Sequence, residues 1–395
     1  MSPVLPFDVV ALIIDIVGEN KDPDLLNELA LVSHSFHQIC IKHLFAEVEL
    51  HDVDHDYFTS SKRGFVKLVR SRPNVVNYIR KLRFKTSRDN DDDHLLSPIL
   101  SNFLPTTSRL NCLSIYASIY HWNELDPSLI SAFVHLMSLP TMNHIDLSHI
   151  VNFPLSTLTS SVNLLRLDMS YLACFRYPEE DNFFKTVQSE MLPKIREFHT
   201  SHSYQLTKKL LDVKGQDGRP VFNFMDVRQL SISFVDFEDN RNIQCLLEKA
   251  KLLERLHLTV DIGMSFVGVL STIGSARTLK VLDLTVHIYS SLARLCEEGL
   301  EVMAGHNTLE ALSFEVLVDS HFTFDSVAST IQQVENKLVK PGWSALRQVS
   351  FKLPVKGRGG SAEFTEALQS LHDKYLSHPS KLESVVFNYL AYGYD

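Results

Sequence analysis

Histidine and aspartate residues gather in two short acidic stretches. In residues 51–56, His51 and His55 are four residues apart, with aspartates between and beside them. On a helix this spacing would bring two metal ligands to one face. The stretch follows a predicted strand and has no helical periodicity, so we expect an exposed acidic loop and no metal site. The run 89–93 lacks the glycine and the terminal glutamate of a calcium-binding loop, so a solvated loop is expected there too.

The sequence contains no familiar motif for catalysis or phosphate binding. Residues 357–361 form a glycine cluster without the lysine and Ser/Thr that end a Walker loop, so we predict a flexible turn. Gly-x-Ser-x-Gly, His-Glu-x-x-His and kinase signatures do not occur, and no spacing selects a catalytic triad. We therefore predict that the protein is not an enzyme and uses no metal or cofactor. An enzyme without a recognisable motif remains an alternative.

Composition and charge restrict the class of partner. The 395 residues carry a net charge of −9, which repels phosphate backbones, so we expect no nucleic acid partner. No apolar run approaches the roughly 18 residues that span a bilayer, and the N-terminus lacks the basic region of a signal peptide, so no membrane partner is expected. The 5 cysteines are far apart and include no C-x-x-C pair. This usage predicts a reducing compartment, cytoplasmic and/or nuclear.

A short apolar pattern recurs along most of the chain. It consists of an apolar residue, two variable residues, a second apolar residue, one variable residue and a third apolar residue. About eleven copies follow one another at intervals of roughly 20 to 37 residues, which is the range of solenoid repeats. The copies begin at Ile79, Leu110, Met142, Val162, Ile195, Val227, Leu253, Leu279, Leu309, Leu346 and Leu382.

The spacing within each copy indicates a strand. The last two apolar positions are two residues apart, so on a strand they share a face. Each strand is too short to bury that face alone, so neighbouring copies must stack in parallel. Parallel strands need crossover connections. Segments between the copies have apolar residues at helical spacing, so helices there can form these crossover connections. Examples are Ile243, Leu246 and Leu247, then Leu300 and Met303, and a segment within 364–371.

The first residues have a different pattern. Val9, Val10, Ile13, Ile14 and Val17 share one broad face of a first predicted helix, which Pro6 can begin because the first turn does not need the missing N–H. A polar connector leads to a second helix, with Asp24 as its candidate N-cap, and a shorter third helix follows. Three such helices barely form an independent core, so this module must pack against a neighbour or a partner.

These patterns predict an α/β fold with three parts. Residues 1–46 form the helical module, 47–74 a linker and first cap segment, and 75–395 an irregular solenoid with a parallel concave sheet and convex helices. A doubly wound α/β domain would also alternate strands and helices. Such a domain usually carries a glycine-rich phosphate turn after an early strand, and none is visible.

Two family resemblances follow from these residues. The recurring pattern resembles the leucine-rich repeat family over roughly residues 75–390. Leu5-Pro6-Phe7-Asp8-Val9, Ile13-Ile14, Asp24-Leu25-Leu26 and the run from Leu29 to Phe36 are similar to the F-box in the form common in fungal repeat proteins. That resemblance implies binding to Skp1, the adaptor of a cullin–RING ubiquitin ligase. The residues it assigns to Skp1 binding are Leu5, Pro6, Ile13, Ile14, Leu29, Val32, Ser33 and Phe36.

The resemblance implies a non-catalytic substrate receptor of a Skp1–cullin–F-box ligase, whose repeats hold an unknown substrate protein. The alternative is a repeat scaffold whose N-terminal helices only cap the solenoid, without a ligase connection. Residues that flank the core positions of the strands should point to the concave face, giving a basic entrance and then an acidic or polar trough. A generic solvated face is the alternative there. The candidate substrate-binding residues are Lys81, Arg83, Lys85, Tyr116, Asp146, Asp168, His257, Asp283 and Glu315.

Overall fold

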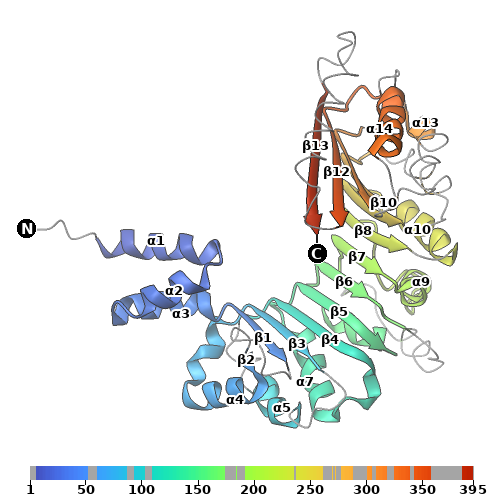
Figure 1. The fold of residues 1–395 in the computed structure, drawn as a ribbon. Coiled ribbons are helices and arrows are strands. Elements are labelled where there is room, and N and C mark those ends of the chain that lie inside the picture. Colours follow the sequence, from blue (N-terminus) through green and yellow to red (C-terminus); the bar gives the residue numbers. More distant parts are fainter. Residues whose placement is uncertain are drawn as a thin grey trace, which may run out of the picture. The chain divides into compact units, whose positions relative to one another are not determined.

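The computed structural model describes most of the chain as two compact units (Figure 1). Unit 1 comprises Met1–Lys194 with Val213–Val221, and unit 2 comprises Ile195–Asp212 with Phe222–Asp395. Each unit is treated by itself below. The described residues are 6–51, 60–86, 93–102, 109–173, 184, 192–234, 237–260, 269, 272, 277–287, 300–304, 308–317, 324–338, 342–356 and 385–394.

Unit 1 begins with three short helices, α1 (Phe7–Glu19), α2 (Pro23–Ala30) and α3 (His34–Leu44). The N-cap of α2 is Asp22, whose side chain accepts a hydrogen bond from the backbone N–H of Leu25, so the expectation of Asp24 was wrong by two residues. Pro23 occupies the first helical turn, where no N–H is needed. The N-cap of α3 is Ser33, whose hydroxyl accepts from the N–H of Phe36.

A small core holds these helices together. Ile14, Leu26, Ile39 and Cys40 are buried at its centre. Partly buried apolar side chains surround it, namely Val10, Ala11, Val17, Leu29, Ala30, Phe36 and Leu44. Each fully buried leucine or isoleucine contributes about 1.5–3 kcal/mol, so four central residues provide only a marginal core.

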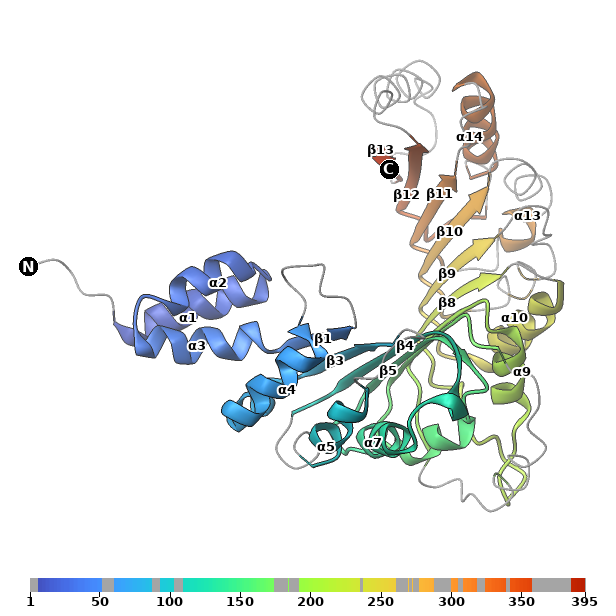
Figure 2. The same ribbon diagram turned by 60° about the horizontal axis from the view of Figure 1, so that its bottom comes forward.

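The rest of unit 1 is a parallel sheet with helices. The strand order is β2-β1-β3-β4-β5-β6, and every pairing is parallel. Figures 1 and 2 show α4, α5 and α7 on one side of these strands. The strands are β1 (Glu47–His51), β2 (Ser60–Ser61), β3 (Lys81–Lys85), β4 (Cys112–His121), β5 (His144–Val151) and β6 (Arg166–Ser170). The helical segments are α4 (Lys62–Ser71), η1 (Pro73–Tyr78), α5 (Asp93–Asn102), η2 (Trp122–Glu124), α7 (Pro127–Met137) and η3 (Leu155–Ser160).

Unit 2 repeats the same construction. Its strands pair in parallel with the next strand in chain order, from β7 to β13. The strands are β7 (Glu197–Ser201), β8 (Gln229–Phe234), β9 (Arg255–Val260), β10 (Val281–His287), β11 (Ala311–Leu317), β12 (Gln348–Lys356) and β13 (Val386–Tyr394). The helices are α9 (Tyr204–Asp212), α10 (Phe237–Lys249), α13 (Leu300–Met303) and α14 (Phe324–Leu338).

Strand register confirms the predicted α/β fold with parallel strands. Equivalent apolar positions of successive copies are direct neighbours and are buried, as Leu256, Leu282, Leu312 and Val349 show. Apart from β2, the strand order in each unit follows the chain without the reversal of a doubly wound sheet. The predicted crossover helices at Ile243 and at Leu300 are α10 and α13, whereas residues 364–371 lie outside the described residues.

Two copies of the apolar pattern lie two residues away from their predicted positions. In β6, Leu167 and Met169 pair with Ile145 and Leu147, while Val162 and Leu165 are exposed. The prediction had placed Leu165 and Leu167 in that strand. A shift of two residues keeps the same side chains on the same face, so the polar positions were still assigned to the correct side.

The last copy is displaced in the same way. Phe387 pairs with Val349 and Tyr389 with Phe351, where the prediction had aligned Val385 and Phe387 with those residues. One further copy was not counted: Val48 and Leu50 of β1 pair with Leu82 and Phe84 of β3 and are buried. The segment 47–74, expected as linker and first cap, therefore carries β1, β2 and α4.

The acidic and glycine-rich stretches fall mainly outside the described residues. His51 ends β1, and residues 52–59, 87–92 and 357–384 are not described. None of the helices in the described part of the chain is long and apolar enough to cross a membrane.

Candidate functional site

Helix α1 carries apolar side chains on two different faces. Val10, Ile14 and Val17 face the small core. Val9, Leu12, Ile13 and Ile16 are spaced by three and four residues, so they form one stripe along the other side, and each is exposed. Leu12 is 60% exposed and Ile13 46%. A helix that is apolar all round is normally covered on both sides, so this stripe, named the α1 stripe below, is a candidate binding surface.

The turn between α2 and α3 exposes a second apolar group. Leu31 is 88% exposed and Val32 64%. Leu25, in the first turn of α2, is also exposed. Leu31 and Val32 lie between the end of α2 and the start of α3, and a partner can reach all three side chains without displacing core side chains.

The structure separates the predicted Skp1-binding residues into three groups. Pro6, Ile13 and Val32 are exposed. Ile14 is only 1% exposed and belongs to the core, against which Leu29 and Phe36 also pack. Ser33 caps α3. Leu5 lies outside the described residues.

Sequence reasoning missed Leu12, Ile16 and Leu31 as surface residues. The signal was present, because α1 is apolar at positions that no single helical stripe can accommodate.

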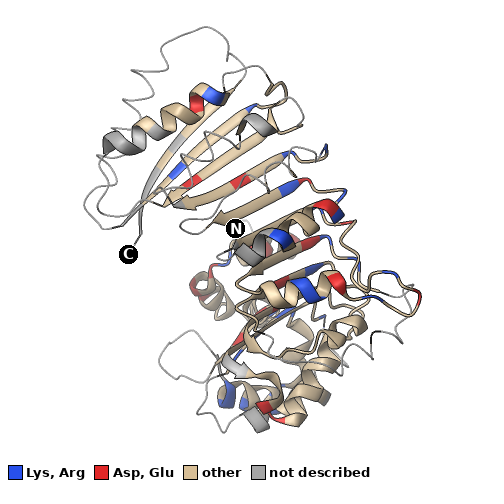
Figure 3. Cartoon of the chain, turned by 90° about the vertical axis from the view of Figure 1, so that its right-hand side faces the viewer, with Lys and Arg blue, Asp and Glu red and all other residues tan. Residues whose placement is uncertain are grey.

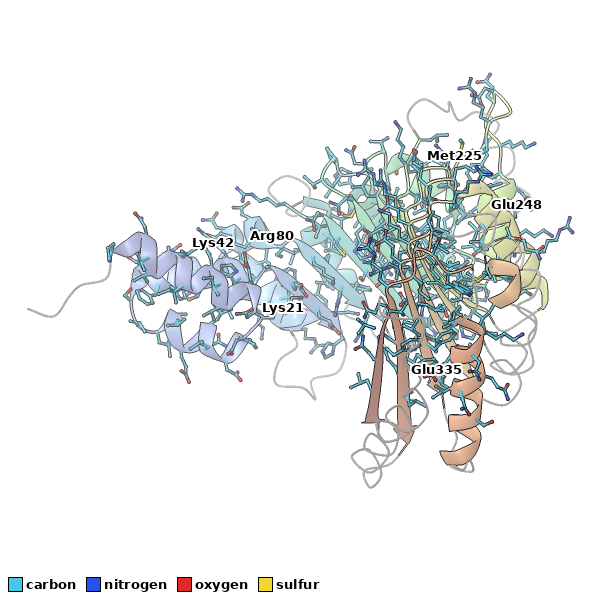
Figure 4. The ribbon with its side chains drawn as sticks, turned by 90° about the horizontal axis from the view of Figure 1, so that it is seen from above. Lys21, Lys42, Arg80, Met225, Glu248 and Glu335 are labelled. Atoms are coloured by element: carbon cyan, nitrogen blue, oxygen red, sulfur yellow. The ribbon has the colours of Figure 1, made fainter. Side chains whose placement is uncertain are left out.

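A hydrogen bond, an ion pair and one close contact connect the parts of the module. His43 Nε2 lies 2.7 Å from Asp15 Oδ1, which ties α3 to α1. Lys21 Nζ lies 2.7 Å from Glu47 Oε1, which ties the α1–α2 connection to β1 (Figure 4). A Cβ atom added to Gly18 would lie 2.2 Å from the Cγ atom of His43, so the observed position of the His43 ring on α1 requires glycine there.

The strands of unit 1 present polar residues on the face opposite their buried leucines. Parallel register arranges these residues in columns that run across the strands. Figure 3 shows both signs of charge on the strands. The first column is Glu47, Lys81, Cys112, His144 and Arg166, the second is Glu49, Arg83, Ser114, Asp146 and Asp168, and the third includes Lys85, Tyr116, Ser148 and Ser170.

The predicted basic entrance on β3 is partly neutralised by β1. Lys85 Nζ lies 2.5 Å from Glu49 Oε1, and Arg83 Nη1 lies 3.6 Å from Glu49 Oε2. The hydrogen bond from Lys85 lowers the pKa of Glu49, against the opposing effect of burial. Sequence reasoning missed Glu49 because β1 was not counted among the repeats.

The predicted acidic residues of β5 and β6 are also engaged. Asp146 accepts hydrogen bonds from the hydroxyls of Ser114 at 3.0 Å and Ser148 at 3.5 Å. Asp168 Oδ2 lies 2.9 Å from His144 Nε2 and 3.0 Å from Arg166 Nη2. The centre of this face is therefore a hydrogen-bonded network and not a set of separate solvated charges.

A row of rings lies beyond this network. Tyr116 packs against His149 with ring centroids 4.7 Å apart, and His149 stacks on Tyr171 at 4.5 Å. His149 and Tyr171 have positive φ angles of 57° and 53°, a region that bulky residues rarely occupy. Both tyrosines remain exposed. Only Tyr116 was predicted for this surface, because the turn geometry that brings in His149 and Tyr171 has no signature in the repeat pattern.

In unit 2 the predicted residues lie in two adjacent columns. His257 and Asp283 are direct register partners, and Glu315 is in the next column, where its carboxylate accepts a hydrogen bond of 3.2 Å from Thr285. Burial lowers the pKa of His257, although Asp283 and Glu315 oppose that effect.

Neither face resembles a metal centre. Over the described part of the chain, no three His, Cys, Asp or Glu side chains form a group that could hold a metal ion. Comparison with known proteins adds no assignment, since no family model and no curated protein matches the chain. The candidate surfaces are thus the exposed apolar residues of the helical module and the polar face of the strands.

Proposed function

We propose that the protein is a non-catalytic adaptor of the F-box type. Residues 1–46 bind Skp1 and thereby a cullin–RING ubiquitin ligase. The leucine-rich-repeat-like strands bind a substrate protein on their polar face. Ubiquitin chemistry takes place on other subunits. The adaptor acts by proximity, because it raises the effective concentration of substrate lysines near the loaded conjugating enzyme.

The exposed α1 stripe is the observation that carries this proposal. The module is folded around Ile14 and Leu26, yet Leu12, Ile13 and Ile16 remain in solvent. Burying apolar surface of this kind contributes about 25 cal/mol per Å² to the free energy of binding. A partner that covers the stripe therefore binds favourably and also stabilises a module with a marginal core. The resemblance to the F-box supplies the identity of that partner.

The polar face of the unit 1 strands suits a protein substrate. Aromatic residues and arginine are enriched at protein interfaces, whereas isolated surface charges contribute little. The ring row of Tyr116, His149 and Tyr171 begins on β4, the strand next to β3, which carries Arg83 of the pair with Glu49. A partner that packs on the rings can displace the exposed ion pair at small cost.

One observation favours a scaffold without a ligase connection. Helix α3 ends at Leu44 and β1 begins at Glu47, and Lys21 pairs with Glu47. The helices thus adjoin the strands closely, as a cap would. A cap, however, has no use for apolar residues on its outer side.

Co-expression with Skp1 followed by affinity capture separates the two functions. The adaptor predicts a stoichiometric complex with Skp1 that withstands washing, and a protein that aggregates more readily without Skp1. The scaffold predicts a soluble protein that does not retain Skp1. The matched control is Met225→Asp, which changes an exposed apolar residue of unit 2 and should leave Skp1 capture unchanged.

A further inference from the structure

Cys112, His144 and Asp168 lie on three adjacent strands and form a hydrogen-bonded chain. Cys112 Sγ lies 3.2 Å from His144 Nδ1, and His144 Nε2 lies 2.9 Å from Asp168 Oδ2. Arg166 holds the carboxylate of Asp168 with its Nε atom at 3.1 Å and its Nη2 atom at 3.0 Å. A thiol, an imidazole and a carboxylate in this order make up the arrangement that activates a cysteine nucleophile.

The surroundings favour a charged imidazole. Burial alone would lower the pKa of His144, but the hydrogen bonds to Asp168 and Cys112 outweigh burial and raise it to about 9. At neutral pH both ring nitrogens therefore carry protons, one directed to Asp168 and the other to the sulfur. A cation that donates a hydrogen bond to a cysteine favours the thiolate.

The charges around the sulfur come from the neighbouring strands. On β3, Lys81 is the direct register partner of Cys112, and Arg83 follows it. Arg166 is the next cation beyond His144. The acids nearby are Glu47 in the same column and Glu49, Asp146 and Asp168 in the adjacent one, where Ser114 donates a hydrogen bond to Asp146.

We propose that Cys112 is a nucleophilic thiolate that hydroperoxides oxidise to a sulfenic acid. The sulfur attacks the terminal peroxide oxygen, a sulfur–oxygen bond forms and the oxygen–oxygen bond breaks. The departing oxygen takes the proton from His144 Nδ1 and leaves as water or an alcohol. Sulfur loses two electrons, the peroxide gains them, and the imidazole ends neutral.

The accessibility of the thiol determines the class of oxidant. Cys112 is 5% exposed, so a small oxidant is favoured over a large one, and the larger trapping reagents used below reach the sulfur through local opening of the structure. An adjacent imidazolium suits a hydroperoxide in particular, because the departing oxygen needs a proton. This proposal is independent of Skp1 binding.

The other described cysteines provide an internal control. Cys40 is buried in the helical core, and burial raises its pKa, which makes it inert. Cys245, on α10, is more accessible than Cys112. If exposure alone decided reactivity, Cys245 would react before Cys112; if pairing with histidine decides, Cys112 reacts first.

The test treats the full-length folded protein with hydrogen peroxide and dimedone, which traps sulfenic acids, and identifies labelled peptides by mass spectrometry. The dimedone label is expected to appear on Cys112 before it appears on Cys245. His144→Gln should slow labelling of Cys112 by at least about tenfold, and Asp168→Asn by less, while His135→Gln on α7 should have no effect. Circular dichroism confirms that each variant is folded.

The wild-type protein also gives a test that does not depend on any variant. The alkylation rate of Cys112 by iodoacetamide should stay nearly constant from pH 6 to 8. A free thiol, with a pKa of about 8.5, accelerates almost in proportion to hydroxide over that range. Equal labelling of Cys112 in His144→Gln and wild type, or a free-thiol pH profile for Cys112, would overturn the proposal.

Discussion

His144 and Asp168, on neighbouring strands of unit 1, form an ion pair with Nε2 and Oδ2 2.9 Å apart. Burial opposes the charge on His144, but its two hydrogen bonds raise its pKa to about 9. The ordinary value in an unfolded chain is about 6.5. Folding therefore stabilises the protonated ring. The contribution of the protonated His144 to the stability of the fold is fully present below about pH 6.5 and is lost as the pH rises through about 9.

This linkage predicts a pH-dependent stability. The Cys112 thiolate proposed above would stabilise the fold increasingly over the same pH range, so the comparison is made without the thiol. The free energy of unfolding of Cys112→Ser should fall by up to about 3 kcal/mol more between pH 6.5 and 9 than that of Cys112→Ser combined with His144→Gln. Adding Asp168→Asn to Cys112→Ser, which removes the partner charge, should make this fall smaller. Urea unfolding at closely spaced pH values measures both. Parallel profiles of Cys112→Ser with and without His144→Gln would show that the pair contributes no such stability.

Gly18 is predicted to be irreplaceable while His43 is present. An added Cβ atom would lie 2.2 Å from the Cγ atom of the His43 ring, so the ring must turn away from Asp15 or α3 must move. We expect Gly18→Ala to destabilise the helical module by about 1–3 kcal/mol. In a His43→Ala background the same change should be neutral or stabilising by up to about 1 kcal/mol, since alanine favours helix over glycine. Denaturant unfolding of the four proteins in this cycle measures the difference.

Two leucines of the helical module should respond oppositely to alanine substitution. Leu26 is buried in the core, so Leu26→Ala should cost about 2–5 kcal/mol of stability. Leu12 is exposed, so Leu12→Ala should change stability by less than about 0.5 kcal/mol and should instead weaken Skp1 binding. Hydrogen exchange of α1–α3 reports the stability. A large loss of stability in Leu12→Ala would show that the α1 stripe is covered within the protein.

The strands were predictable because short parallel strands must share one periodic pattern. Leu256 and Leu282 occupy the same position of their copies and became direct neighbours. The copies that were misplaced, at Leu167 and at Phe387, are those in which additional apolar residues such as Leu165 offer a second alignment. Periodicity alone cannot choose between alignments that differ by two residues, because both keep the same face buried.

The side-chain networks were harder to predict. Cys112 and His144 are separated by 32 residues, and His144 and Asp168 by 24, so no local spacing marks them. They meet because strand register brings equivalent positions together. The same register places Glu49 beside Arg83, which neutralises a surface that appears basic from β3 alone. Aligning the copies by their buried residues would have revealed both relationships.

The most direct test of the adaptor function is a titration of the purified protein with Skp1. Ile13→Asp combined with Val32→Asp should weaken the complex at least about 30-fold, because both side chains are exposed on the module and a partner must bury the introduced charges. Met225→Asp should bind like wild type. Unchanged affinity in the double variant, or no binding by folded wild type, would contradict the adaptor function and leave a repeat scaffold whose partner contacts the polar face of the strands.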